Sequence, residues 1–364
     1  LAFWNHKDTI LKERLFGLTN NEGNHGEDVK ELYYYLDSTP THSYMKMLYK
    51  YPIEAFPYEK ITGENNRRNI REDEFEIIDT GIFDDNKYFD IFVEYAKKEE
   101  NDILIKITAT NRSKKEAPLT VLPTIWFRNT WSWGYEEFDK KPILSGIANS
   151  QIEVNHRLFE RMKLYCHGAD ALIFCENETN MERVFGKENI SPYTKDGINN
   201  YIVHGKEKAI NHNQIGTKAS AKYTRKIKAG ESETFWLRFS DQTNLKEPFQ
   251  NFEEVFAESL KTADDFYEII QKDIKSEEEK AIQRQAFAGM MWSKQFYYYN
   301  IDQWMNGDPK MPFEFRGRAF ERNSPWKHAY MANILSMPDK WEYPWFAAWD
   351  LAFHTATLAR IDPD

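Results

Sequence analysis

Residues 344–359 are apolar almost throughout, and Asp350 is the only formally charged residue among them. A helix that is apolar all round is normally buried on most of its faces. A carboxyl group in such surroundings is costly to ionise, so its pKa rises and the group stays protonated near neutral pH. A protonated carboxylic acid can donate to a glycosidic oxygen, which makes Asp350 a candidate general acid. Capping of a neighbouring helix and pairing with a buried arginine are the structural alternatives.

Four aromatic residues precede or adjoin this acid: Trp341, Tyr343, Trp345 and Trp349. Aromatic rings stack on the flat C–H faces of sugar rings, so these residues could line a sugar-binding pocket and keep water from the acid. Trp345 and Trp349 are four residues apart, and this helical spacing fits packing in a core equally well. Glu342, eight residues before the acid, is interpreted as a substrate contact, a loop ion pair or a catalytic base.

A second aromatic group surrounds an arginine at the end of a predicted strand: Trp126, Arg128, Trp131 and Trp133. The forked guanidinium of Arg128 could bind sugar hydroxyls or orient a carboxylate, and it could equally brace a contact between domains. His328 lies shortly before the acid segment and is a candidate for orienting its neighbours.

A polar cluster near the N-terminus consists of Glu22, His25, Glu27 and Asp28. Its spacing matches neither an EF-hand nor a zinc pattern. The interpretations are a turn with solvated charges, a contact with substrate or with the helical domain, and a Ca²⁺ site, in that order. No metal or other cofactor is predicted.

Alternating apolar residues predict the strands that must support these groups, at 88–95, 102–110 and 119–127, with Pro123 marking a bulge or an edge. Residues 222–228 and 234–240 predict a hairpin around Gly230. Many short strands joined by turns indicate an antiparallel sandwich.

Helical spacing replaces this alternation from 252 to 274, and Ser276 with Glu279 forms a capping box for a helix running towards Tyr299. Residues 301–323 are typical of a loop, and a last helix is expected from Pro344 to Arg360. We therefore expect β-sandwich at 1–245, a linker helix region at 246–275 and a helical domain at 276–364.

Composition narrows the class of protein. The 364 residues carry a net charge of −10 without a basic tract, which argues against nucleic acid or anionic membranes as partners. No apolar run could span a bilayer and no signal peptide opens the sequence. Cys166 and Cys175 are expected to be buried thiols, and the expected location is cytoplasmic. Both ends of the sequence have the character of cuts within a larger protein.

Four stretches of the chain, residues 336–354, 17–28, 33–44 and 124–134, together resemble glycoside hydrolase family 63. The resemblance implies a β-supersandwich followed by an (α/α)6 toroid, of which 276–364 would hold the first helices. It also implies hydrolysis of an oligosaccharide or small α-glycoside with inversion. Asp350 matches the family's general acid, whereas the general base, a Glu, would lie in the remainder of the catalytic domain.

Two other functions stay open. A glycoside phosphorylase of the same plan would use phosphate where the hydrolase uses water. A carbohydrate-binding or structural fragment would bind sugar without turnover, since half of the catalytic pair falls outside this sequence.

Overall fold

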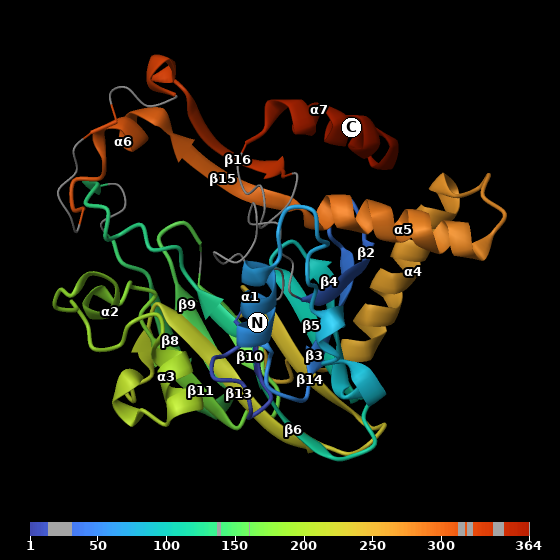
Figure 1. Ribbon diagram of the computed structural model, residues 1–364, viewed down its shortest axis with the longest axis horizontal. Coiled ribbons are helices and arrows are strands. Elements are labelled where there is room, and N and C mark those ends of the chain that lie inside the picture. Colours follow the sequence, from blue (N-terminus) through green and yellow to red (C-terminus); the bar gives the residue numbers. More distant parts are fainter. Residues whose placement is uncertain are drawn as a thin grey trace.

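The computed structural model describes residues 1–13, 31–136, 140–159, 161–311, 317–318, 323–337 and 346–363 (Figure 1). The strands in this part of the chain are β1 (Ala2–Trp4), β2 (Leu32–Ser38), β3 (Tyr44–Pro52), β4 (Tyr88–Glu99), β5 (Asp102–Asn111), β6 (Ala117–Leu122), β7 (Thr124–Trp126), β8 (Ile143–Ile147), β9 (Gln151–Asn155), β10 (Met162–Cys166), β11 (Ala171–Cys175), β12 (Ile215–Gly216), β13 (Lys218–Ile227), β14 (Ser232–Ser240), β15 (Lys294–Asn300) and β16 (Tyr330–Ser336). The α-helices are α1 (Tyr58–Arg67), α2 (Met181–Phe185), α3 (Gly197–His204), α4 (Phe252–Ile270), α5 (Glu277–Trp292), α6 (Ile301–Asn306) and α7 (Ala348–Ile361). None of these helices combines the length and the apolar character that crossing a bilayer requires.

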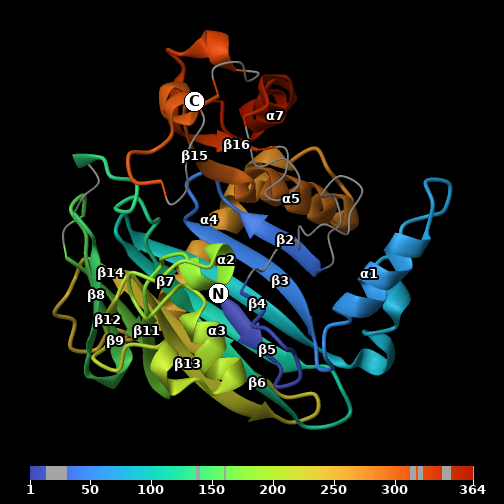
Figure 2. The same cartoon turned by 60° about the vertical axis from the view of Figure 1, so that its left-hand side comes forward.

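Two antiparallel sheets form the body of the molecule (Figure 2). One has nine strands in the order β12-β8-β9-β10-β14-β5-β4-β3-β2, and the other joins β1, β6, β13, β11 and β7. Buried side chains from both sheets fill the space between them, including Tyr49, Phe89, Val121 and Tyr223. The predicted antiparallel sandwich is confirmed by this arrangement.

The alternating patterns at 88–95 and 102–110 form β4 and β5, which pair along most of their length. Phe89, Ile91 and Val93 are buried on the inner face, as the two-residue repeat of a strand predicts. Pro123 separates β6 from β7, because proline has no N–H to donate to a ladder.

The predicted hairpin at 222–240 is wrong. Gly230 does make a turn, with φ of 73°, but β13 pairs with β6, β7 and β11, whereas β14 pairs with β5 and β10. The turn therefore carries the chain from one sheet to the other, and the Tyr223 and Phe235 rings meet across the core at 5.0 Å. A turn signal specifies the reversal of the chain but not the partner of each strand.

The predicted helices at 252–274 and after Ser276 are present as α4 and α5. Ser276 caps α5, because its hydroxyl accepts a hydrogen bond from the Glu279 N–H at 3.4 Å. The expected continuation to Tyr299 is wrong: α5 ends at Trp292 and residues 294–300 form β15. The aromatic run favours a strand, and β16 pairs with it along its whole length.

Two further boundaries differ from the prediction. Residues 301–306 form the short helix α6 within the expected loop, because the Asn300 side chain caps the N–H groups of Asp302 and Gln303 at 3.0 and 3.3 Å. The last helix, α7, begins at Ala348, whereas Pro344 lies outside the described residues.

Both cysteines are buried, as predicted: Cys166 on β10 and Cys175 on β11. Burial raises the pKa of each thiol to about 12. The thiolate is the reactive form, so neither side chain is placed to act as a nucleophile in the folded chain.

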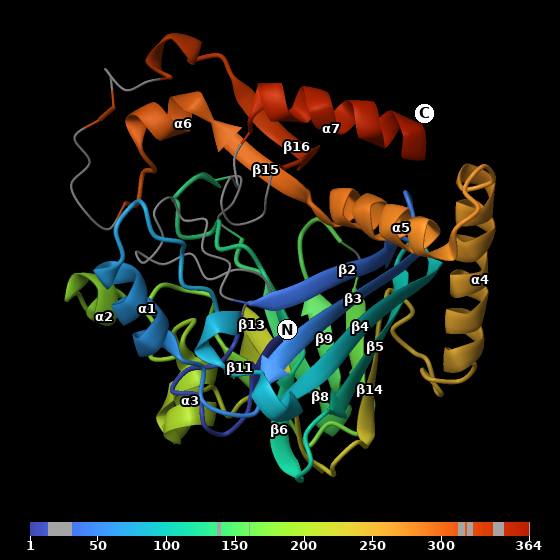
Figure 3. The same ribbon diagram turned by 45° about the vertical axis from the view of Figure 1, so that its right-hand side comes forward.

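An ion-pair network joins the helices to the sandwich where α5 lies along β2 (Figure 3). Arg284 of α5 pairs with Asp37 of β2 and, at 2.7 Å, with Asp264 of α4. The Trp292 indole donates to the Asp37 carbonyl at 3.0 Å. Burial raises the pKa of the Asp37 carboxyl, while its hydrogen bond and attraction to Arg284 oppose that rise.

We expect Arg284→Met to destabilise the chain by about 1–3 kcal/mol at pH 7, because it leaves a buried carboxylate without its partner. The pKa of Asp37 should rise further, so the folded state takes up a proton as the pH falls. The loss of stability should therefore shrink between pH 7 and the mildly acidic range, as urea unfolding at several pH values would show.

Lys261→Met is the matched control, since Lys261 forms a solvent-exposed pair with Asp265 on α4 and its loss should change stability much less than the loss of Arg284 does. An Arg284→Met deficit that is equal at pH 7 and pH 4 would contradict the assignment.

Candidate functional site

A cavity of about 290 Å³ lies between the loop after β7 and one face of the β15–β16 hairpin. The sandwich and the β15–β16 hairpin both contribute side chains to it. Its lining residues are Phe127, Arg128, Thr130, Trp133, Lys140, Pro142, His156, Arg157, Leu158, Phe296, Tyr298, Tyr330 and Ala332.

Backbone hydrogen bonds hold the loop in place. The Phe127 N–H donates to Thr217 at 3.1 Å, and the Phe127 carbonyl accepts from the Asn177 side chain at 2.8 Å. Further along, the Lys310 N–H donates to the Trp133 carbonyl at 3.0 Å, which ties the loop to the segment after α6. Gly134 permits this approach: its φ is 90°, and an added Cβ would lie 2.7 Å from Lys310.

The hairpin supplies the opposite wall through its two-residue repeat. Successive side chains of a strand face opposite sides, so Phe296 and Tyr298 share one face of β15. Residues directly opposite each other in an antiparallel pair share a face, and Tyr298 is opposite Ala332 while Asn300 is opposite Tyr330. The hairpin therefore presents four lining residues on this one face: Phe296, Tyr298, Tyr330 and Ala332. Tyr297 lies on the other face, where the backbone of Phe346 hydrogen-bonds its hydroxyl.

Arg128 is an exposed residue that lies beside two aromatic rings. Its guanidinium carbon lies 5.2 Å from the ring centres of both Trp133 and Tyr298, and those rings are 5.8 Å apart. Part of the side chain stays exposed, while desolvation lowers the pKa of Arg128 from its usual value. Arginine nevertheless remains charged, so the cavity contains a cation held by aromatic faces.

His156 lines the same cavity and stacks on Phe127, with ring centres 5.3 Å apart. Its Nδ1 accepts a hydrogen bond from the Leu158 N–H at 3.1 Å, so the neutral ring carries its proton on Nε2. Burial, followed by the charge of Arg157, lowers the pKa of His156. The ring is therefore a neutral donor at pH 7.

The structure separates the four residues of the second aromatic group. Arg128 and Trp133 line the cavity, but Trp131 donates through its indole to Glu178 at 3.0 Å, and that carboxylate also pairs with Lys141. Trp126 is 56% exposed and lines a different hollow beside the N-terminus. Trp131 thus has its partner away from the cavity, and Trp126 is not part of the cavity lining.

The expected burial of α7 is wrong for the residues that the structure describes. Ile361 is its one buried side chain, whereas Trp349 and Phe353 are 76% and 65% exposed and Asp350 is exposed too. The physical reason is that α7 packs on α5 only near its C-terminal end. A hydrogen bond of 3.1 Å between His354 and Ser336 fixes its middle to β16.

The Asp350 carboxylate makes no hydrogen bond or ion pair with another described residue. Neither structural alternative, a cap on a neighbouring helix or a pair with an arginine, is found in this part of the chain. His328 is exposed beside Trp326, with ring centres 6.2 Å apart, and lies two residues before the cavity residue Tyr330. The following predicted residues lie outside the described ranges: Glu22, His25, Glu27, Asp28, Trp341, Glu342, Tyr343 and Trp345.

Sequence reasoning missed the hairpin wall, including Phe296, Tyr298 and Tyr330. The available signal was the four-residue aromatic run at 296–299, which favours a strand. It also missed His156, for which the sequence offers no distinguishing pattern.

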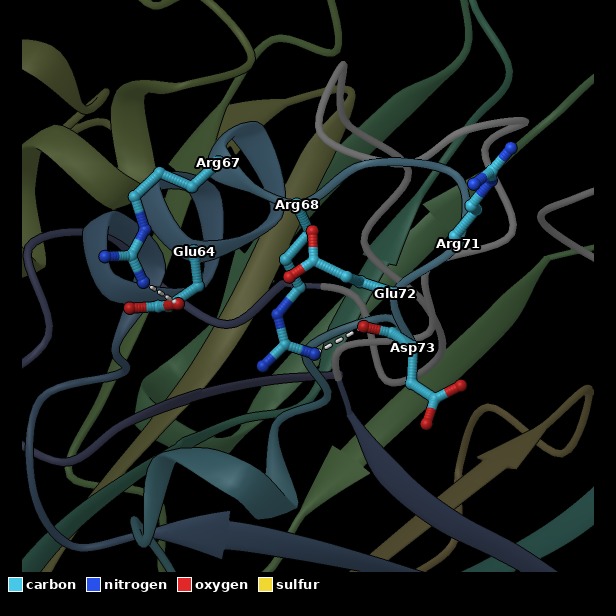
Figure 4. Close-up of a pocket in the computed structure, with 6 residues that line it drawn as sticks. All are labelled: Glu64, Arg67, Arg68, Arg71, Glu72 and Asp73. Carbon is cyan, nitrogen blue, oxygen red and sulfur yellow. Dashed lines mark hydrogen bonds and ion pairs between the residues drawn. The ribbon is translucent and has the colours of Figure 1, made fainter.

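A second hollow, of about 620 Å³, lies beside the end of α1 (Figure 4). Three arginines and three acidic residues line it: Glu64, Arg67, Arg68, Arg71, Glu72 and Asp73. Arg67 pairs with Glu64, Arg68 hydrogen-bonds the Asp73 carbonyl, and Arg71 points away from the others. Because these charges offset one another at an open surface, we assign no ligand to this hollow.

No family model matches this chain. An uncharacterized protein of Saccharomyces cerevisiae is 42% identical over 409 residues, and the match covers 100% of this chain but 38% of the yeast protein. The chain thus spans 38% of the length of that relative. The resemblance to glycoside hydrolase family 63 therefore stays a prediction.

Two solved structures show weaker similarity. A polysaccharide lyase matches with a TM-score of 0.23 and 12% identity, over 42% of this chain and 20% of that protein. A protein described as a kojibiose phosphorylase from human microbiome matches with a TM-score of 0.21 and 9% identity, over 59% of this chain and 23% of that protein. At these TM-scores neither similarity carries an argument about fold or activity.

Proposed function

We propose that this chain supplies a sugar-binding surface and the general acid of an inverting α-glycosidase of the family 63 type. One observation carries the proposal: aromatic faces and the Arg128 guanidinium line a single cavity of about 290 Å³. Aromatic rings stack on pyranose C–H faces, and the guanidinium offers five N–H donors to hydroxyl oxygens. The volume lies near the lower end of small-molecule sites, about 300–1,000 Å³, and suits one sugar ring.

Asp350 is proposed to protonate the departing oxygen. A Glu from a part of the whole protein that this chain does not span would activate the attacking water, with the carboxyl groups about 6.5–9.5 Å apart. Trp341, Glu342, Tyr343 and Trp345 remain proposed substrate contacts, and Trp349 is exposed next to the acid. The β15–β16 hairpin contacts both parts: Tyr298 faces the cavity from one side of β15, and Tyr297 on the opposite side meets the backbone of Phe346, just before α7.

The rest of the catalytic domain is proposed to cover α7. The chain spans 38% of its yeast relative, and the apolar side chains Trp349 and Phe353 are exposed. Helices that complete an (α/α)6 toroid could pack on this face and surround Asp350. Such burial would keep the carboxyl protonated and ready to donate.

The test uses the whole protein with α-linked glucosides and follows the released sugar by ¹H NMR. Release of β-glucose at early times is the expected result, because attack by water from the face opposite the leaving group inverts the anomeric carbon. Release of α-glucose would contradict inversion. Cleavage that needs phosphate and yields glucose 1-phosphate would indicate a phosphorylase instead.

Sugar binding without turnover is the second candidate. It is favoured by the absence of a carboxylate among the described residues that line the cavity. Saturable binding of glucose or maltose by the whole protein, with no product after prolonged incubation, would support this candidate over the hydrolase.

A further inference from the structure

The cavity assigned to a sugar is cationic, although the chain as a whole carries a net charge of −10. Arg128, Lys140 and Arg157 contribute positive charge to its wall, and none of the described lining residues is Asp or Glu. In an acidic protein, a hollow lined by Arg128 and Lys140, with no carboxylate among its described lining residues, favours an anion.

Arg128 has the geometry to receive that anion. Its guanidinium lies 5.2 Å from the ring centres of both Trp133 and Tyr298 and forms no hydrogen bond or ion pair with another described residue. The two rings restrict the guanidinium without using its N–H donors. A planar fork of this kind matches the paired oxygens of a carboxylate or a phosphate.

His156 complements the arginine without adding charge. Its pKa is lowered, and its Nδ1 is occupied by the Leu158 N–H, so the ring is a neutral Nε2–H donor at pH 7. The aromatic side chains of Phe127, Phe296 and Tyr330 line the same cavity. The cavity thus contains aromatic side chains on which a sugar ring could stack, next to N–H donors that could bind an oxyanion.

We propose that this cavity binds a sugar carrying an oxyanion, either a phosphate or a carboxylate group, with the oxyanion on Arg128 and the ring against the aromatic wall. This inference rests on the proposed function, since it takes the cavity to be the sugar site. It specifies in addition that the substrate carries a negative charge, whereas a simple α-glucoside is neutral.

Isothermal titration calorimetry on the full chain tests the proposal with four probes: glucose, glucose 6-phosphate, glucuronate and inorganic phosphate. We expect one or both anionic sugars to bind at least about 10-fold more tightly than glucose, which corresponds to one charge-assisted hydrogen bond or more. The comparison of glucose 6-phosphate with glucuronate identifies which oxyanion is preferred.

Arg128→Met should abolish the preference for the anionic sugar, and Arg128→Lys should retain only part of it, because lysine keeps the charge but loses the fork. Arg318→Met is the matched control: Arg318 also stacks on a tryptophan, at 3.6 Å from the Trp304 ring, but does not line the cavity. The control should bind like the unmodified chain. If Arg128→Met does not fold, a partial loss in Arg128→Lys carries the same information.

Equal affinity for glucose and both anionic sugars would overturn the proposal while leaving the proposed function intact. Inorganic phosphate binding as tightly as glucose 6-phosphate would also overturn it, since the ring would then contribute nothing. Binding of no sugar at all would remove the cavity from the proposed function as well.

Discussion

Replacing Asp350 by asparagine is expected to lower turnover of α-glucosides by the whole protein by about 10²–10⁴-fold, the range that general acid catalysis contributes. Asparagine keeps the size and polarity of the side chain but has no carboxyl proton to give to the departing oxygen. The loss should appear in kcat, because sugar binding depends on other side chains. Initial rates over a range of substrate concentrations measure it.

A structural role for the same residue predicts a different outcome. Asp350 is exposed, has no described partner and lies in the first turn of α7, where a negative charge interacts favourably with the helix dipole. Its removal should therefore cost less than about 1 kcal/mol of unfolding free energy. The control is Asp362→Asn, an exposed carboxylate at the other end of α7, which should leave turnover unchanged.

Normal turnover in Asp350→Asn would remove this residue from the mechanism. A loss of several kcal/mol in stability, in place of a loss in kcat, would show that the side chain holds the fold together.

Arg238→Ala is expected to produce the largest loss of stability, about 3–5 kcal/mol, because it leaves a buried carboxylate without its counterion. Arg238 of β14 and Asp102 at the start of β5 are almost wholly buried, and two N–H groups of the guanidinium bind the two carboxylate oxygens. A third donates to the Pro248 carbonyl at 2.9 Å, just before α4. Urea unfolding followed by circular dichroism measures the change.

Arg225→Ala is the matched control. Arg225 of β13 also pairs with an aspartate, Asp170, at 2.9 Å, but both side chains are about one-third exposed. Solvent screens such a pair, so its loss should cost at most about 1 kcal/mol. Similar losses for the two arginines would show that burial does not set the contribution of the Asp102 pair.

Local pattern identified some of the strands and helices that face a buried core, but it missed others, such as β3 and β10. The two-residue repeat identified β4 and β5, and the helical repeat of Phe252, Phe256 and Ala263 identified α4, because those side chains face buried surfaces. The pattern did not predict which strands pair with each other. β13 and β14 are neighbours in the sequence yet belong to different sheets, and the aromatic run of β15 is a strand because β16 pairs with it.

The candidate site likewise contains some residues that the sequence predicted and others that only the structure revealed. Arg128 and Trp133 were found from residue type and spacing, whereas Tyr298, Tyr330 and His156 come from three other segments and share no sequence pattern with them. The expected burial of Asp350 failed because an apolar helix shows only that something can cover it. It does not show which element does so.

By itself, the amino-acid sequence indicated the strands at 88–95, 102–110, 119–127, 222–228 and 234–240, the helices that begin at Phe252 and after Ser276, the burial of both cysteines, and the candidacy of Arg128 and Asp350. These depend on side-chain chemistry and on repeats over a few neighbouring residues. Only the tertiary structure decided which strands share a sheet, that the hairpin and the loop after β7 form one cavity, and that Trp131 turns towards Glu178. Those outcomes depend on contacts between residues far apart in the chain, whose energies are set by the whole packed arrangement and not by any local stretch.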